Sequence, residues 1–320
     1  MATADQIKSL IRSHYENNSD RFATTALQLA AHEARQGHSG LAEEIRKLVQ
    51  KNNEKGFKLI PLQREGLDEL ILTSKSQKRL GQMVLSQDLR KRLDRIIREY
   101  RHQDRLKEKG YSNRRKILLS GPPGTGKTLT ASVIAGELHL PLYTILMDKM
   151  VTRFMGETGA RLRQIFNIIQ SHRGVYFFDE FDAIGGERGL PNDVGEMRRV
   201  LNAFLQFIEQ DRSDSFIIAA TNNVILLDRA LFRRFDDVIT YQLPDDPEIL
   251  EVIITHLGEF KISGGVKSLL KHAQGLSHAD IARAVDDAVK QTILEERKIV
   301  SRHDLLSALQ DRRSVYYGKE

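Results

Sequence analysis

The residues with the clearest chemical meaning form one short run, Gly121-Pro122-Pro123-Gly124-Thr125-Gly126-Lys127-Thr128. The run has the pattern G-x-x-x-x-G-K-[ST], in which glycines let the backbone curl so that its N–H groups point at phosphate oxygens. Lys127 brings a cation to the β- and γ-phosphates, and the hydroxyl of Thr128 can bind Mg²⁺. We therefore expect residues 122–128, together with Leu129, to bind ATP or GTP.

The elements needed to position this loop are present on both sides of it. Lys116 to Ser120 is apolar enough for a buried strand, and Leu129 to Leu138 has the composition of a helix whose positive N-terminus would face the nucleotide. Strands and helices then alternate, with strands expected at 142–147, 175–180, 215–220 and 238–242 and helices at 158–170 and 200–208. The pattern predicts an α/β fold, a five-stranded parallel sheet with helices on both faces.

Two carboxylates stand at the end of the apolar strand Val175-Tyr176-Phe177-Phe178. Downstream of a phosphate loop, Asp179 can hold Mg²⁺ and Glu180 can orient and deprotonate an attacking water. A protein that only bound a nucleotide would not need the second acid, so Glu180 favours hydrolysis. A structural role for both acids would place uncompensated charge at a buried strand end, which is costly. Asp182 is the weaker candidate, as an arginine partner or a turn cap.

Two further polar groups follow the next strand. Asn222, with Asn223 as the alternative, can hydrogen-bond both the γ-phosphate and the water held by Glu180. Arg233 and Arg234 lie between apolar residues, and paired arginines cannot be buried there without anions. A guanidinium suits the spread charge of a γ-phosphoryl transition state, whereas the competing interpretation is an ordinary surface salt bridge.

Composition limits the class of protein. The chain has 320 residues, of which 40% are hydrophobic and 29% charged, so it can bury a sizeable core. It has no cysteine, which excludes disulfides, thiol catalysis and thiolate metal sites. The first residues lack the basic and apolar regions of a leader, and no run approaches the roughly 20 apolar residues of a membrane span. We expect a cytoplasmic protein without membrane contact.

The net charge of +6 is concentrated in one segment. From Arg90 to Lys116 there are twelve Lys/Arg against four Asp/Glu. A nucleic-acid contact is one interpretation of this segment, and the solvated face of a long helix is the other. Tyr100 and Tyr111 are the only aromatics there, so the charge pattern favours the solvated face.

Four regions are expected along the chain. Residues 1–53 have the pattern of three short helices, either a recognition domain or a unit that packs on the main body. Residues 54–81 are an irregular linker, and 82–243 form the large α/β nucleotide-binding domain. Residues 244–320 are expected to form a four-helix lid with a short C-terminal tail.

The order of these motifs resembles the AAA branch of the AAA+ ATPases. The phosphate loop, Phe-Phe-Asp-Glu, Ala-Ala-Thr-Asn, Arg-Arg-Phe-Asp and a helical lid follow one another over residues 82–310. The compact Arg-Arg-Phe is similar to the katanin and spastin group, and the compact plan is similar to bacterial remodelling ATPases. The resemblance implies a ring, usually a hexamer, that hydrolyses Mg-ATP. It implies that Glu180 acts in catalysis and that Asn222, which matches the family's first sensor, does so too. Arg233 and Arg234 match the family's arginine fingers and would act on the nucleotide of the neighbouring subunit.

The resemblance also extends to two substrate-facing loops and to the lid. Met150 to Thr158 resembles the first pore loop of the family, with Phe154 and Met155 gripping an extended polypeptide, and 189–196 suits a second pore loop with Arg188 as a contact. In the lid, Ser277-His278-Ala279-Asp280 resembles the family's Ser-Gly-Ala-Asp beside the nucleotide base. His278 replaces the glycine, which puts close backbone approach in doubt, while Ala279 is kept.

The resemblance predicts a Mg-ATP-driven ring that threads and unfolds or remodels a protein partner docked on the N-terminal helices, as in bacterial phage defence. The chain has no His-Glu-x-x-His and no nucleophile elbow, so a protease activity of its own is not expected. The alternatives are a nucleic-acid motor or loader that uses Arg90 to Lys116, and a scaffold switched by ATP.

Overall fold

The computed structural model describes residues 25–26, 29–30, 38, 40, 43–44, 70–150, 155–181, 191–223 and 232–317. The chain divides into two compact units, Met1–Gln63 and Arg64–Glu320. In the first unit the described residues 25–26, 29–30, 40 and 43–44 are helical, and Ala26 and Ala30 are buried. The rest of the predicted N-terminal helices lies outside the described residues.

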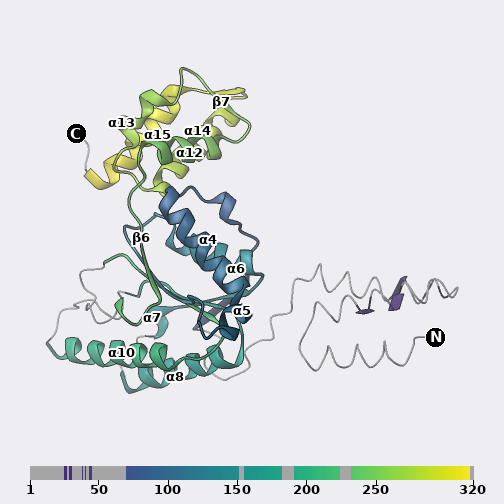
Figure 1. The fold of residues 1–320 in the computed structure, drawn as a ribbon. Coiled ribbons are helices and arrows are strands. Elements are labelled where there is room, and N and C mark those ends of the chain that lie inside the picture. The colour runs from purple at the N-terminus through teal and green to yellow at the C-terminus, as the bar shows by residue number, and fades with distance from the viewer. Residues whose placement is uncertain are drawn as a thin grey trace. The chain divides into compact units, whose positions relative to one another are not determined.

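The second unit is built on a six-stranded sheet (Figure 1). Its strands are β1 (Ile71–Lys75), β2 (Lys116–Ser120), β3 (Pro141–Ile145), β4 (Val175–Phe178), β5 (Phe216–Thr221) and β6 (Asp237–Thr240), in the order β1-β3-β4-β5-β2-β6. All pairings among β2 to β6 are parallel, so the predicted five-stranded parallel sheet is confirmed. Because the strands run in one direction, their carboxyl ends lie along one edge of the sheet, where ligands bind in such folds.

The sixth strand corrects the prediction of an irregular linker at 54–81. β1 lies inside that range and pairs antiparallel with β3, with Ile71 opposite Ile145. Leu70 and Ile71 are buried, whereas Leu72 is largely exposed. Pairing with the open edge of β3 satisfies backbone N–H and C=O groups that an irregular connection would leave to solvent. Because this stabilisation comes from a strand about 70 residues away, the sequence around β1 carries no clear strand pattern.

Helices cover both faces of the sheet (Figure 1). They are α4 (Gln87–Arg101), α5 (Gln103–Glu108), α6 (Lys127–Leu138), α7 (Met147–Met150), α8 (Met155–Ser171) and α10 (Pro191–Gln210). α4 and α6 share one core with Ile117, Leu119 and Phe177. On the other face Phe166 of α8 stacks on Phe178, and Phe204 of α10 meets Phe178 edge-on. The long helix considered for the basic segment is divided between α4 and α5 at His102, which leaves helical geometry at φ −112° and ψ 21°.

The lid has a hydrophobic core of its own. It contains the four predicted helices, α12 (Asp246–Leu257), α13 (Leu270–Ala273), α14 (His278–Leu294) and α15 (Arg302–Tyr317), with the 3₁₀ turn η2 (Lys267–Leu269) before α13. Another 3₁₀ turn, η1 (Leu80–Gln82), precedes α4 in the large domain. A small parallel pair, β7 (Lys261–Ile262) with β8 (Ile299–Val300), was not predicted. Asp245 and Ser277 accept hydrogen bonds at the starts of α12 and α14, which fixes where each helix begins. Among the described helices none has the length and apolar character to cross a bilayer.

Candidate nucleotide site

The loop between β2 and α6 has the geometry that a phosphate cradle needs. Gly121, Gly124 and Gly126 have φ values of 138°, 74° and 102°, a region that side chains with a Cβ rarely adopt. A Cβ on Gly121 would lie 2.4 Å from the carbonyl oxygen of Tyr241. α6 begins directly after the loop, so its unpaired N–H groups and positive helix end face the space that the loop encloses.

Lys127 turns back onto its own loop. Its Nζ donates to the carbonyl oxygens of Gly121 at 2.7 Å and Pro122 at 2.8 Å. The residue is 7% exposed, so these carbonyls compensate the desolvation of its charge. Both acceptors lie within the loop itself, and phosphate oxygens can take their place with only a short movement of the ammonium group.

Asp179 lies beside the loop, at the end of β4. Thr128 Oγ1 donates to Asp179 Oδ2 at 3.0 Å, which brings together the two oxygens predicted to bind Mg²⁺. A hydroxyl and a single carboxylate fit this ion, because Mg²⁺ in nucleotide sites takes one or two protein oxygens plus phosphates and waters. Within the described residues there is no group of three or more His, Cys, Asp or Glu that could hold a metal ion.

Glu180 adopts a backbone conformation that is unusual for a glutamate. Its φ is 50°, and its N–H donates to Asp179 Oδ1 at 2.9 Å. The next residue, Phe181, is fully buried and its N–H donates to the carbonyl oxygen of Ala220 at 2.8 Å, which fixes the turn. The side chain of Glu180 is exposed and that of Asp179 half-buried, so the burial argument against a purely structural role does not apply to Glu180. Positive φ at this position is the observation that favours function instead.

Asn222 follows the neighbouring strand at the same edge. β5 pairs with both β2 and β4, and the N–H of Gly121 donates to the carbonyl oxygen of Thr221 at 3.3 Å. The side chains of Asn222 and Asn223 are both exposed. The parallel register therefore brings the phosphate loop, Asp179 with Glu180, and Asn222 to one edge of the sheet, and their individual roles remain predictions.

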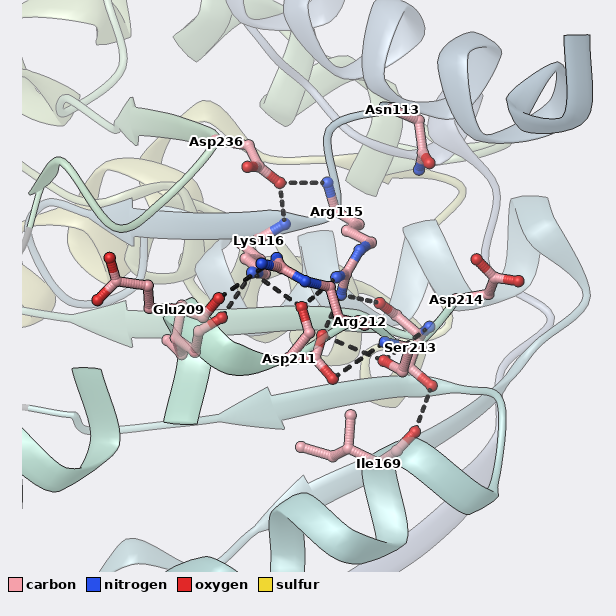
Figure 2. Close-up of polar contacts among 12 residues, drawn as sticks. Asn113, Arg115, Lys116, Ile169, Glu209, Asp211, Arg212, Ser213, Asp214 and Asp236 are labelled. Atoms are coloured by element: carbon pink, nitrogen blue, oxygen red, sulfur yellow. Dashed lines mark hydrogen bonds and ion pairs between the residues drawn. The ribbon is translucent and has the colours of Figure 1, made fainter. Parts of the chain in front are cut away.

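Arg233 and Arg234 lie at the other end of the sheet. Both are exposed, so the argument from buried arginines does not hold, and Arg234 forms an ion pair with Glu209 at the end of α10. Asp236, which follows them, accepts hydrogen bonds from the N–H groups of Arg115 and Lys116 at 2.9 Å each (Figure 2). The two arginines are thus close to the start of β2, whereas the phosphate loop follows its end.

A buried ionic network holds that start of β2, and nothing in the sequence pattern indicated it. Arg115 forms an ion pair with Asp211, which is fully buried, and Lys116 Nζ donates to the carbonyl oxygens of Ile208 at 2.5 Å and Asp211 at 3.3 Å (Figure 2). Burial, followed by the charge of Arg115, lowers the pKa of Lys116. The network joins β2 to the end of α10 across more than ninety residues of sequence.

The first turn of α14 in the lid rests on the phosphate loop. The N–H of Ala279 donates to the carbonyl oxygen of Gly124 at 3.0 Å, and a Cβ on Gly124 would lie 2.3 Å from Ser277 Oγ. Close approach is therefore present although His278 stands where the family has glycine. Burial lowers the pKa of His278, and its Nδ1 is buried without a hydrogen-bond partner among the described residues. His278 and Thr125 line a cavity of about 250 Å³ between the lid and α4.

Several predicted residues lie outside the described residues. They include Phe154, Asp182 and Arg188. For Met155 the structure gives only its place as the first residue of α8. The segment 191–196, predicted within a second pore loop, is helical because α10 begins at Pro191, and proline is well suited to the first turn of a helix.

Six of the twelve basic side chains between Arg90 and Lys116 form ion pairs within the chain. The ion pairs are Arg92–Asp237, Arg95–Glu99, Arg101–Glu137, Lys107–Asp214, Arg114–Glu99 and Arg115–Asp211. In the part of the chain that the structure describes, Lys91, Arg98, Arg105 and Lys109 make no ion pair. Internal pairing reduces the charge that a nucleic acid would meet.

Comparison with known proteins gives two kinds of match. The family model described as "ATPase family associated with various cellular activities (AAA)" matches residues 117–243. The chain is 31% identical over 318 residues to "Uncharacterized AAA family ATPase y4kL" of Sinorhizobium fredii, a match that covers 97% of this chain and 96% of that protein. It is 33% identical over 232 residues to "ATP-dependent zinc metalloprotease FtsH" of Parabacteroides distasonis, which covers 69% of this chain and 34% of that protein.

Proposed function

This chain belongs to the AAA family of ATPases, and we propose that it works as a ring of identical subunits that uses ATP hydrolysis to remodel a protein partner. As a member of that family it is an ATP-hydrolysing enzyme with an α/β P-loop fold. The ring, its hexameric size, the remodelling activity and the place of Mg²⁺ are parts of the proposal.

The observation that carries the proposal is the separation between the arginine pair and the phosphate loop. Arg233 and Arg234 stand near the start of β2, and the loop follows its end. Five residues of strand span roughly 16 Å at about 3.3 Å per residue, which is farther than an arginine side chain extends. This separation supports the proposal that the two guanidinium groups serve the nucleotide of another subunit, so that the catalytic site forms only in an assembly.

Each residue at the carboxyl edge has a proposed role. Thr128 and Asp179 hold Mg²⁺, which when bound supplies positive charge to the phosphates. Glu180 orients and deprotonates the attacking water, and Asn222 hydrogen-bonds that water and the γ-phosphate. Lys127 contacts the β- and γ-phosphates, and Ala279 lies beside the bound nucleotide because its N–H is already bonded to the loop.

The substrate side of the proposal rests on the resemblance. Phe154 and Met155 are proposed to line the central channel, residues 1–53 to dock a protein partner or adaptor, and the large domain and lid to span 82–243 and 244–320. The katanin and spastin subgroup is proposed on Arg-Arg-Phe, and participation in phage defence on the resemblance alone. We propose a cytoplasmic location, which the absence of a membrane-spanning helix among the described residues supports.

A nucleic-acid motor is the second candidate, and the basic segment is the feature that favours it. Its internal ion pairs weaken this candidate, because six of its basic side chains are already bound to carboxylates of the same chain.

The test is a substrate trap based on Glu180→Gln. This variant is expected to bind ATP without hydrolysing it, so that a threaded partner remains in the ring. The tagged variant is incubated with ATP in a lysate of its own cells, half of it treated with nuclease, and the bound material is identified by mass spectrometry and nucleic-acid staining.

Two variants make the result specific. A protein that is retained after nuclease, and lost when Phe154→Ala is added to the trap, would support threading through the ring. The same protein should be lost when Lys127→Ala prevents nucleotide binding. Nucleic acid as the main ATP-dependent companion, with salt-sensitive binding, would replace this proposal with the second candidate. Full cellular function in the Glu180→Gln variant would point to an ATP-switched scaffold.

A further inference from the structure

A chain of buried hydroxyl groups runs from the end of the sheet to the phosphate loop. The hydroxyl of Tyr241 lies 2.5 Å from Thr130 Oγ1, and Thr130 Oγ1 donates to the carbonyl oxygen of Gly126 at 3.0 Å. Thr130 is fully buried and Tyr241 nearly so. Neither residue belongs to the phosphate-loop motif, and neither was singled out from the sequence.

The direction of these hydrogen bonds follows from the donors available. The hydroxyl of Thr130 has one hydrogen, which it gives to the carbonyl of Gly126. Its oxygen can therefore only accept from Tyr241, whose hydroxyl must donate. Burial raises the pKa of Tyr241 to about 12, so the phenol keeps its proton at neutral pH. The arrangement is a directed relay from Tyr241 through Thr130 to the backbone of the loop.

The atom at the end of the relay controls a group that faces the phosphates. In a planar trans peptide the C=O of Gly126 and the N–H of Lys127 point in opposite directions. The carbonyl of Gly126 also accepts the N–H of Thr130 at 2.9 Å, so it is held toward the interior of α6 by two donors. Holding the carbonyl inward aims the N–H of Lys127 outward, into the space where the loop binds phosphate.

The other end of the relay is the connection to the lid. Tyr241 donates its N–H to the carbonyl oxygen of Ser120 at 2.7 Å, and its own carbonyl oxygen is packed against Gly121. Five residues later α12 of the lid begins, at Asp246. The phosphate loop is therefore held at two points: by α14 of the lid at Gly124, and by Tyr241, which precedes the lid in the chain, through Thr130 at Gly126.

We infer that Tyr241 and Thr130 are positioning residues for nucleotide binding, which orient the Lys127 N–H and link the geometry of the phosphate loop to the base of the lid. They do not touch the reacting atoms. The inference concerns nucleotide binding by the ATPase, so it is independent of whether the partner that the ring remodels is a protein.

The test is a set of variants that remove single hydroxyl groups. Tyr241→Phe and Thr130→Val should each raise the dissociation constant of a fluorescent ATP analogue by about twofold to tenfold, the effect of one lost hydrogen bond. The kcat at saturating ATP should stay unchanged, because the chemical groups are untouched. The double variant should bind no more weakly than either single variant, because both break the same relay. Thr130→Ser keeps the hydroxyl and should bind like the wild type.

Tyr176→Phe is the matched control. Tyr176 is also fully buried in the sheet, and its hydroxyl donates to the carbonyl oxygen of His172 at 2.8 Å, with no contact to the loop. Its loss should lower the melting temperature to a similar degree as Tyr241→Phe while leaving ATP affinity unchanged.

Three results would overturn the inference. One is wild-type affinity in Tyr241→Phe, and a second is an equal loss of affinity in Tyr176→Phe, which would indicate general loosening of the sheet. The third is weak binding in Thr130→Ser. All binding is measured on the full chain at equilibrium, so none of these results depends on the remodelling activity.

Discussion

Two buried lysines flank β2 and the phosphate loop, and they differ in the backbone carbonyls that accept from them: Lys116 is the first residue of β2, and Lys127 is the first residue of α6, beyond the loop. Lys127 is 7% exposed and Lys116 8%, and each donates to two backbone carbonyls. The acceptors of Lys127 lie five and six residues away in its own loop. Those of Lys116 lie 92 and 95 residues away, at the end of α10.

Burial and the number of carbonyl acceptors are the same for both lysines, so these properties do not distinguish the lysine predicted to bind phosphate from the lysine that holds the fold. The positions of the acceptors along the chain do. The two carbonyl acceptors of Lys127 lie in the loop that would bind phosphate, so phosphate oxygens can replace them. Replacing the acceptors of Lys116 would detach α10 from β2, because Asp211 and Arg115 belong to the same network (Figure 2). The sequence separation between a buried lysine and its carbonyl acceptors therefore indicates which role the lysine has.

The largest effect is expected when the phosphate-loop lysine is removed from one chain and the arginine pair from another. Lys127→Ala and the double variant Arg233→Ala/Arg234→Ala should each lower the ATPase rate by at least about 100-fold, because each removes positive charge from the transition state. Mixed together, the two inactive proteins should regain part of the rate, since one supplies an intact loop and the other intact arginines. Phosphate release over a range of mixing ratios measures this.

Each inactive protein mixed with wild type is the control for this experiment. A mixture that stays as inactive as its components, although the proteins co-assemble by size-exclusion chromatography, would contradict action across subunits.

A smaller but clear effect is expected at the structural end. Asp211→Ala leaves Arg115 without its buried carboxylate partner and removes the negative charge near Lys116, so it should lower the free energy of unfolding by about 3 kcal/mol. Urea unfolding followed by circular dichroism measures it. Asp214→Ala, which removes an exposed partner of Lys107, should cost less than about 1 kcal/mol. If both variants lost the same free energy of unfolding, the buried ionic network around Asp211 would not be what stabilises the start of β2.

Glu209→Gln tests whether Arg234 belongs to the structural end. The ion pair between Glu209 and Arg234 is exposed on both sides, so its loss should change the free energy of unfolding by less than about 1 kcal/mol. The same urea unfolding measurement applies. A loss as large as that of Asp211→Ala would assign Arg234 to the buried network and argue against its proposed role on a neighbouring nucleotide.

The smallest effect concerns the lid above the loop and depends on pH. Burial lowers the pKa of His278 below its usual value near 6.5, so the unfolded chain binds a proton more readily than the folded one. Stability should therefore fall as the pH drops below about 6.5. Melting temperatures at pH 8 and pH 5.5 should show a smaller drop for His278→Gln than for the wild type. His303→Gln, at an exposed site, should behave like the wild type.

The sequence by itself determined the parts whose physics is local. Gly121, Gly124 and Gly126 take positive φ values that glycine adopts far more readily than other residues, so the loop is readable from eight consecutive residues. Apolar runs likewise indicated the five parallel strands and the helices of the lid, since periodicity records which residues are buried.

The tertiary structure decided which distant segments meet. It alone showed that β1 completes the sheet, that Arg234 pairs with Glu209, and that Tyr241 donates to Thr130. The physical reason is that periodicity specifies that a residue is covered but not by which segment. Partners far apart in the chain are selected by the packing of the whole domain, in which each contact must offset the conformational entropy lost in forming it.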